Sequence, residues 1–293
     1  MQTAHSFDAE TYKDTLRQEW REAAPGWRTW YPVLEAEEAH PRVGRTLIEQ
    51  VDLTPGDRVL DVGAGYGEPG LTAARAVAPG GRVILQDLAG DMLAFARERA
   101  EQLDLGDVEV EVAHGDVEEL DLEPGGLDAI LARSVLMYLV DPAGTLERLR
   151  PALRPGGRLA ASTWAAPDKV AIAAPVPLIR DMLELPPPPP GQPGLFALAD
   201  PDKLAAVVAD AGFAEVRTGT AHAVFEFASP DEATQFLRDC APPVTALVAE
   251  QPSDVQDQVW ARVTEEAWAP FATPDGRVRL PNEANWVAAV NPR

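Results

Sequence analysis

The chain has 293 residues, of which 46% are hydrophobic, and its 47 acidic side chains outnumber its 25 Lys and Arg side chains, giving a formal charge of -22. A chain this negative repels nucleic-acid phosphates and anionic membranes, so we expect neither as a partner. Cys240 is the only cysteine, which excludes an intramolecular disulfide and a cysteine-based metal cluster, and no metal is expected. No run approaches ~18 consecutive apolar residues, and the N-terminus lacks the pattern of a signal peptide, so we expect a cytoplasmic protein.

The first 50 residues have mostly helical patterns and are rich in aromatic side chains, among them Trp20, Trp27, Trp30 and Tyr31. This is too much apolar area to leave in water, so we expect the segment to pack against the rest of the chain.

The middle of the chain alternates short apolar runs with helical patterns, which predicts a doubly wound parallel sheet. The predicted strands are Val59–Val62, Gly81–Asp87, Val108–Asp116, Leu127–Arg133 and Arg158–Trp164. Two later segments, Glu215–Phe227 and Val278–Val290, have the pattern of long strands and are expected to pair as an antiparallel edge. The sequence therefore predicts an α/β fold with a mostly parallel seven-stranded sheet.

Two stretches interrupt this alternation. Residues 165–200 include the run "LPPPPPGQPG", which requires extended backbone, and residues 229–275 have helical patterns. We interpret both as inserts beside the sheet.

The stretch "VLDVGAGYGEPG" at Val59–Gly70 predicts a nucleotide-binding turn. A dinucleotide fingerprint needs a small residue at its third glycine position, counted from Gly63, but that position is Glu68. Asp61 lies two residues before Gly63, where a carboxylate would repel a pyrophosphate. S-adenosylmethionine carries no phosphate and a net positive charge, so the acidic turn favours it as the cofactor.

Acidic residues also follow the next two predicted strands. Asp87 stands at the end of the second strand, where a carboxylate can accept hydrogen bonds from both hydroxyls of a ribose. Asp116 stands at the end of the third, where it can accept from the adenine amino group, with the Val117 N–H beside it. The carboxyl ends of adjacent parallel strands face one crevice, so these groups are expected to form one site.

These motifs, with "VILQDLAGDML", "HGDVEEL", "LDAILARSVLMYLVDP" and "LRPALRPGGRLAAS", resemble the class I S-adenosylmethionine-dependent methyltransferases. The resemblance covers roughly residues 55–165 and is closest to the ubiquinone/menaquinone-biosynthesis C-methyltransferases and related small-molecule enzymes. It implies a cofactor site whose residues are Asp61, Gly63, Ala64, Gly65, Asp87, Leu88, Met92, Asp116, Val117 and Arg133. In it, the glycine turn and Arg133 lie near the methionine part, Asp87 binds the ribose, Leu88 and Met92 flank the adenine, and Asp116 and Val117 hold its edge. A salt bridge from Arg133 to Asp61 or to a surface acid is an equal alternative.

The resemblance also implies an activity and a division of the chain. We expect methyl transfer to the O or C atom of a small apolar or aromatic acceptor, polyketide- or quinone-like, by a monomer or homodimer. Residues 1–50 are expected to form a helical lid over a core of residues 51–293, with further lid elements at 165–200 and 229–275. The proposed acceptor contacts are Trp27, Trp30, Tyr31 and Met137.

Two alternatives remain open at this point. An enzyme of this fold can use the bound cofactor for a non-methylating reaction such as cyclisation or decarboxylation, and a cofactor-binding regulatory protein can lack catalysis.

A sulfonium methyl group is already activated, so alignment and exclusion of water matter more than acid–base groups. The possible bases are His5, His40, His114 and His222. Among these we single out His40, because the N-terminal region is expected to cover the active site.

Overall fold

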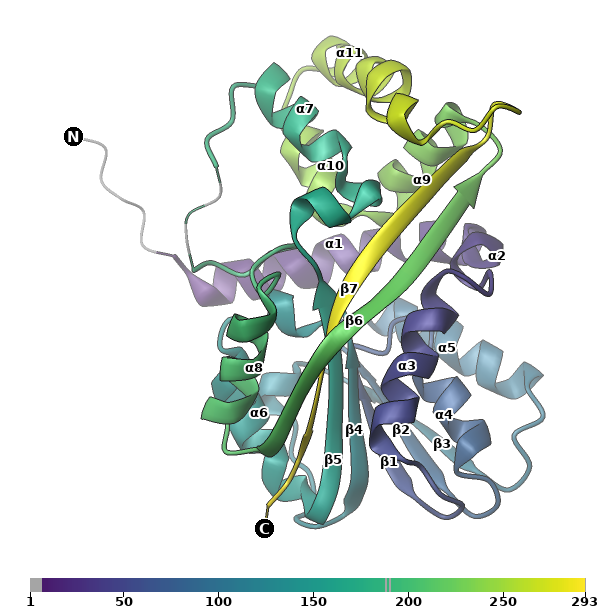
Figure 1. The fold of residues 1–293 in the computed structure, drawn as a ribbon, viewed down its shortest axis with the longest axis vertical. Helices are drawn as coiled ribbons and strands as arrows, with labels where there is room; N and C mark the ends of the chain where they lie inside the picture. Colours follow the sequence, from purple (N-terminus) through teal and green to yellow (C-terminus); the bar gives the residue numbers. More distant parts are fainter. Residues whose placement is uncertain (1–6, 188, 190, 293) are drawn as a thin grey trace.

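The computed structural model describes residues 7–187, 189 and 191–292, and these build a seven-stranded sheet (Figure 1). Its strands are β1 Arg58–Val62, β2 Arg82–Asp87, β3 Glu109–His114, β4 Leu127–Arg133, β5 Leu153–Trp164, β6 Ala214–Phe227 and β7 Val278–Val290. The spatial order is β3-β2-β1-β4-β5-β7-β6. Strands β1 to β5 are parallel, and β7 pairs antiparallel with both β5 and β6. The predicted fold class and antiparallel edge are thus confirmed.

Helices cover both faces of the sheet and one of its ends (Figure 1). Their bounds are α1 Ala9–Thr29, α2 Tyr31–Leu34, α3 His40–Val51, α4 Gly70–Ala76, α5 Gly90–Gln102, α6 Pro142–Leu149, α7 Pro175–Met182, α8 Pro201–Asp210, α9 Pro230–Cys240, α10 Pro242–Ala249 and α11 Ser253–Arg262. One face carries α3, α4 and α5, and the other carries α6 and α8. None of the helices in the described ranges is long and apolar enough to cross a membrane.

The central strands are buried on both sides because successive side chains point to opposite faces. In β1, Leu60 joins the cluster beneath α6 and α8, together with Ile130 of β4. Its neighbour Val59 joins the cluster beneath α3 and α4, together with Leu131. This is why these strands appear in the sequence as almost continuous apolar runs.

Strand β5 begins at Leu153, five residues before the predicted start at Arg158. Leu127 pairs with Leu153 and Ala129 with Arg158, so the intervening "RPGG" residues are accommodated as an irregularity within the strand. The preceding helix α6 accordingly ends at Leu149, and a short 3-10 turn at Arg150–Ala152 leads into the strand.

A helical cap lies beyond the carboxyl ends of the parallel strands. Strands β6 and β7 extend past their neighbours and reach α9 and α11, while α7 and α10 complete the cap (Figure 1). The cap has its own aromatic core, which contains Phe225, Phe236, Trp260 and Trp268. The segments 165–200 and 229–275 contribute these helices, so both lie beside the carboxyl end of the sheet.

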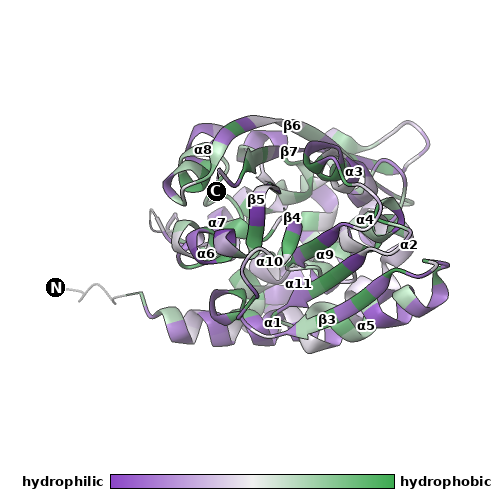
Figure 2. Ribbon diagram, turned by 90° about the horizontal axis from the view of Figure 1, so that it is seen from below, coloured by the Kyte–Doolittle hydropathy of each residue, from purple (hydrophilic) through white to green (hydrophobic). Residues whose placement is uncertain are grey.

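The two long helices of residues 1–50 occupy different places. Helix α1 runs along one side of the molecule past β3 and α5 and contacts α9 of the cap (Figure 2). Helix α3 packs on the sheet against β4, β5, β6 and β7. Only the first of these two helices therefore has the position of a cover.

Candidate functional site

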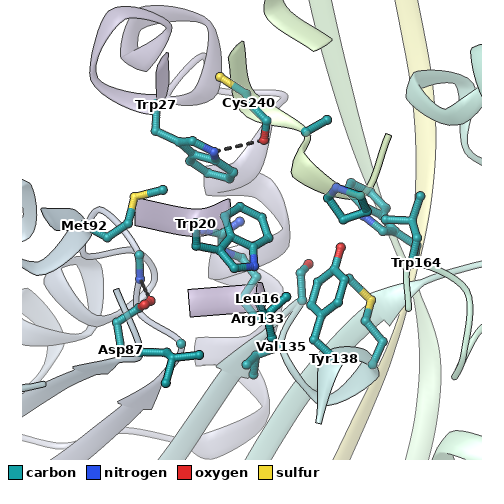
Figure 3. Close-up of a pocket in the computed structure, with 18 of the residues that line it drawn as sticks. Leu16, Trp20, Trp27, Asp87, Met92, Arg133, Val135, Tyr138, Trp164 and Cys240 are labelled. Carbon is teal, nitrogen blue, oxygen red and sulfur yellow. Dashed lines mark hydrogen bonds between the residues drawn. The ribbon is translucent and has the colours of Figure 1, made fainter. Parts of the chain in front are cut away.

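A cavity lies between the carboxyl ends of the parallel strands, α1 and the cap (Figure 3). One part of its lining comes from the turns that follow β1, β2, β3 and β4, and includes Asp87 and Arg133. The other part is apolar and aromatic, with Trp20 and Trp27 from α1 and Trp164 from the end of β5. Figure 3 shows Asp87 and Met92 on one side of the cavity and Trp164 on the other.

The glycine turn after β1 forms part of this wall. Gly63 and Gly65 have φ values of +61° and +54°, a backbone region in which glycine is strongly favoured. A Cβ atom added to Gly65 would meet nothing within 4 Å, whereas one added to Gly63 would lie 2.7 Å from Val135. The Gly65 position therefore keeps the cavity open, and the Gly63 position allows close packing behind it.

Asp87 connects the end of β2 to this turn. One carboxylate oxygen accepts from the Gly65 N–H at 2.8 Å, and the other accepts from the Ala89 N–H at 2.8 Å. Burial raises the pKa of Asp87, while these backbone donors oppose the rise. Each oxygen keeps lone-pair capacity for a further donor, such as a hydroxyl group in the cavity.

Asp116 lies two residues beyond the end of β3, where it caps a short 3-10 turn by accepting from the Glu118 N–H at 2.8 Å. Its other oxygen lies 2.8 Å from the ammonium of Lys13 on α1, which also pairs with Glu118. Our sequence interpretation missed Lys13. A usable signal was available, because this acidic chain has only two other lysines, Lys169 and Lys203.

Asp61 and Ala64 do not line the cavity. Asp61 is fully buried below the turn, where one oxygen accepts from the Gly70 N–H at 2.7 Å and the other has no partner among the described residues. Burial raises its pKa to about 8. Ala64 is also fully buried, and its N–H donates to the Gln86 carbonyl at 2.8 Å. Both residues support the turn from its buried side, and neither side chain faces the cavity.

Arg133, at the end of β4, lines the cavity and donates to the Glu68 carbonyl from two nitrogens, at 3.2 and 3.0 Å. The alternative for this residue was a salt bridge to Asp61 or to a surface acid, and among the described residues Arg133 forms neither. The remaining predicted cofactor residues that line the cavity are Leu88, Met92 and Val117.

The predicted acceptor residues separate into two groups. Trp27 lines the cavity and donates from its indole to the Cys240 carbonyl at 3.0 Å, and Met137 also lines the cavity. Trp30 instead packs against Phe236 in the cap core and bonds to Asp239. Trp30, a predicted acceptor contact, thus lies outside the described cavity lining, because α1 ends at Thr29, between Trp27 and Trp30.

Tyr31 also lies away from the cavity lining. Its ring packs edge-on against Phe95 and Tyr66, and the Arg99 guanidinium lies 4.7 Å from its centre. Trp20 and Trp164 line the cavity, although neither was a predicted acceptor contact.

Of the three histidines in the described ranges, His40 is the one that lines this cavity. It is buried, and its Nδ1 lies 3.1 Å from the Tyr66 hydroxyl. The His114 ring bonds to the Leu88 carbonyl, and His222 lies on β6 beside a separate cavity. His5 lies outside the described residues.

Comparisons with known proteins agree with this architecture. A family model for a methyltransferase domain matches residues 53–183. A demethylmenaquinone methyltransferase of Clavibacter sepedonicus is 33% identical over 125 residues, which cover 43% of this chain and 45% of the relative. The nocamycin O-methyltransferase of Saccharothrix syringae is 31% identical over 197 residues, covering 60% of this chain and 65% of the relative. The chain thus spans less than two thirds of the length of either curated relative.

Solved structures share the fold at low sequence identity. A phosphoethanolamine N-methyltransferase 2 of Haemonchus contortus superimposes with a TM-score of 0.58 at 17% identity, covering 96% of this chain and 60% of that one. The [4+2]-cyclase SpnF superimposes with a TM-score of 0.57 at 17% identity, covering 96% of this chain and 98% of that one.

The glycine turn follows the first strand of the seven-stranded sheet and lies inside the segment that matches a methyltransferase domain. The acidic residues after β2 and β3 converge on the same crevice. With this strand order and this turn, the chain is similar over residues 53–183 to methyltransferase domains, and it shares its fold with a solved methyltransferase.

Proposed function

We propose that this chain binds S-adenosylmethionine along the ends of β1 to β4 and transfers its methyl group to a small apolar or aromatic acceptor, polyketide- or quinone-like, at oxygen or carbon. The observation that carries the proposal is a single cavity that joins the glycine turn and strand-end carboxylates to an aromatic compartment. A cofactor and an acceptor held in one cavity can meet in line, which is the main requirement of a displacement at a sulfonium.

The residues present fit this cofactor. The open space beside Gly65 forms a cradle that a Cβ atom would fill. Asp87 presents a carboxylate held in place by two backbone N–H groups, as recognition of vicinal hydroxyls requires. Leu88, Met92 and Val117 line the neighbouring wall with apolar groups that suit the faces of an adenine. When bound, the cofactor would supply the activated methyl group.

The other side of the cavity fits an apolar ring system. Trp20, Trp27, Trp164, Phe225 and Phe236 all contribute to its wall. Aromatic walls of this kind offer stacking and edge-to-face contacts to a flat ligand. The charged side chains in the described cavity lining are Asp87, Asp116 and Arg133, and all three lie at or just beyond the carboxyl ends of parallel strands. An uncharged acceptor therefore meets little desolvation cost in the aromatic part.

The cover over this cavity supports the same function. Helix α1 and the cap helices contribute to the wall of the space at the carboxyl end of the sheet, and their closure on a bound ligand would keep water from the reacting atoms. The formal charge of -22 disfavours nucleic acid as the acceptor.

The test has two stages. Calorimetric titration with S-adenosylhomocysteine measures cofactor binding, and failure to bind would refute the proposal at its first step. Isotope-labelled S-adenosylmethionine is then supplied with a panel of phenols, quinols and polyketide-like enols, and products are identified by mass spectrometry. We expect label in the product. A converted acceptor that gains no methyl group would instead establish a non-methylating reaction such as cyclisation.

A further inference from the structure

His40, the first residue of α3, joins the cofactor side of the cavity to its aromatic side. We propose that His40 is the general base of the reaction, that Tyr66 and Glu35 position it, and that the acceptor presents a phenolic or enolic hydroxyl group to its Nε2 atom. This inference rests on the methyl transfer proposed above and narrows it from an apolar acceptor at O or C to a hydroxyl acceptor.

The hydrogen bonds around Tyr66 determine which nitrogen of His40 carries the proton. The Tyr66 hydroxyl donates to a carboxylate oxygen of Glu35 at 3.1 Å. A hydroxyl group has one hydrogen, so towards His40 Nδ1, also at 3.1 Å, the same oxygen acts as the acceptor. Nδ1 therefore carries the hydrogen, and in the neutral ring Nε2 holds an unshared pair.

The Nε2 atom is available to a ligand. Within the described residues it has no hydrogen-bond partner. Among the described residues, the polar side-chain atoms that are fully enclosed and have no hydrogen-bond partner are Asp61 Oδ1, Arg82 Nε and Ser162 Oγ. His40 Nε2 is not one of them, so this atom is not fully enclosed by protein. Because the His40 ring lines the cavity, the open side of Nε2 is the cavity itself.

Aromatic neighbours hold the imidazole in this orientation. The Trp27 ring stacks on it with 5.7 Å between centroids and 20° between planes, and the Phe225 ring meets it edge-on at 5.3 Å. Trp27 is fixed in turn by its bond to the Cys240 carbonyl. The ring is thus positioned from α1, α3 and β6 together, which is the preorganisation that proton transfer requires.

The titratable and charged groups around His40 support this role. They are Tyr66, Glu35, Glu68, Arg99 and Arg133. Burial, assisted by the Arg133 charge, holds the pKa of His40 well below its ordinary value, so the ring is neutral at physiological pH. Burial and the nearby Glu68 raise the pKa of Glu35, so its carboxylate can accept a proton passed through Tyr66. The Glu35 side chain is 21% exposed, which gives that proton an exit to water.

In the proposed step, the acceptor oxygen forms a bond to the methyl carbon while the carbon–sulfur bond of S-adenosylmethionine breaks, and the bonding pair stays on sulfur. The hydroxyl proton moves to His40 Nε2. The Nδ1 proton moves to the Tyr66 oxygen, and the Tyr66 hydroxyl proton moves to Glu35. The products are an ether, a neutral thioether, a protonated Glu35 and a His40 ring with its hydrogen on Nε2. Glu35 releases its proton to water, and His40 returns to the Nδ1-protonated form by proton exchange with water once the ether has left.

The first test reads the tautomer directly. Nitrogen NMR of the histidine rings, with S-adenosylhomocysteine present, should show one signal that disappears in His40→Gln and has the shifts of a neutral ring protonated at Nδ1. Tyr66→Phe should move that signal, because its hydrogen-bond partner is lost. A ring protonated at Nε2, or at both nitrogens, at pH 7 would overturn the proposal.

The second test compares His40→Gln with His222→Gln, which makes the same change at an exposed position on β6. With 1-naphthol as the acceptor, which is un-ionised at pH 7, we expect His40→Gln to lower kcat at pH 7 by about 10²–10⁴-fold, whereas 4-nitrophenol, which is already about half ionised at that pH, should show a much smaller loss. The loss should shrink towards the pH at which each phenol ionises, because a phenolate needs no base. His222→Gln should retain the wild-type profile.

The outcomes distinguish a wrong assignment of His40 from a failure of the proposed methyl transfer. If the wild-type chain does not bind S-adenosylhomocysteine, the proposed methyl transfer itself fails. If it binds but methylates only carbon or nitrogen acceptors, the assignment of His40 is wrong while methyl transfer stands. The same conclusion follows if His40→Gln has no effect on methyl transfer across the pH range. Calorimetry should show equal S-adenosylhomocysteine binding by wild type, His40→Gln and His222→Gln.

Discussion

The Lys13 ammonium of α1 lies 2.8 Å from the carboxylate of Asp116, which follows β3. This pair ties the N-terminal helix to the part of the cavity assigned above to the adenine. A second tie lies one residue away, where the Tyr12 hydroxyl donates to the Tyr138 carbonyl at 3.1 Å. The cover over the cavity is therefore attached by contacts that a single substitution can weaken.

Lys13→Ala should loosen α1. The pair is partly exposed, so we expect a cost of at most ~1 kcal/mol in global stability and a clear rise in hydrogen exchange across α1. S-adenosylhomocysteine should slow exchange in the same helix if the helix closes on the ligand. Lys203→Ala, on α8, is the control and should leave α1 unchanged. Equal exchange of α1 in Lys13→Ala and wild type would show that the ion pair does not hold the cover.

Gly65→Val should abolish cofactor binding in a folded protein, because the new side chain enters the cradle. Gly106 has a similar φ, +63° against +54°, and is likewise free of neighbours within 4 Å. Gly106→Val therefore introduces comparable backbone strain outside the cavity. We expect both variants to lose similar stability by thermal denaturation, while only Gly65→Val loses S-adenosylhomocysteine binding in calorimetry. Full binding by Gly65→Val would remove the turn from the site.

Asp87→Ala should weaken S-adenosylhomocysteine binding by about 1–3 kcal/mol, because a charge-assisted acceptor for the ribose hydroxyls is lost. The measurement is the dissociation constant from calorimetry. Asp121→Ala, in an exposed loop, is the matched control and should bind as wild type does. If Asp87→Ala folds and binds equally well, the carboxylate serves only the backbone N–H groups of Gly65 and Ala89.

Asp61 should make stability fall as pH rises. Its pKa is about 8 in the folded chain against an ordinary value of 3.8, so between these values the folded state holds a proton that the unfolded state has released. The free energy of unfolding then decreases with pH, by at most ~1.4 kcal/mol per pH unit for this group. Asp61→Asn should flatten the profile measured by urea denaturation from pH 5 to 8. Asp121→Asn should leave the slope in place, and an unchanged slope in Asp61→Asn would contradict the assignment.

Trp27→Ala and Trp30→Ala should have different effects. Trp27 lines the cavity, so its loss should raise KM for an aromatic acceptor clearly and lower Tm only slightly. Trp30 packs in the cap core and bonds to Asp239 at 2.8 Å, so its loss should lower Tm clearly, because truncating a core tryptophan costs about 3–5 kcal/mol in the free energy of unfolding. Kinetics and thermal denaturation of both variants test this. A raised acceptor KM in Trp30→Ala with an unchanged Tm would contradict it.

Much of the fold follows from local pattern. Strands β1 and β4 are apolar runs because both of their faces are buried, and the turn after β1 needs glycines at positive φ. The placement of Asp87 and Asp116 in one crevice follows from the rule that parallel strands end at the same edge. For these features, the spacing along the chain determines the spacing in the molecule.

The tertiary structure alone decided the rest, because the partners are far apart in the sequence. Lys13 and Asp116 meet only when α1 crosses the end of β3, and Trp27 and Trp30 separate because α1 ends between them. Asp61 faces inward beneath the turn that its neighbours open to the cavity. The orientation of His40 towards the cavity depends on Tyr66 and Trp27, which come from different elements, so no pattern within a single segment could specify it.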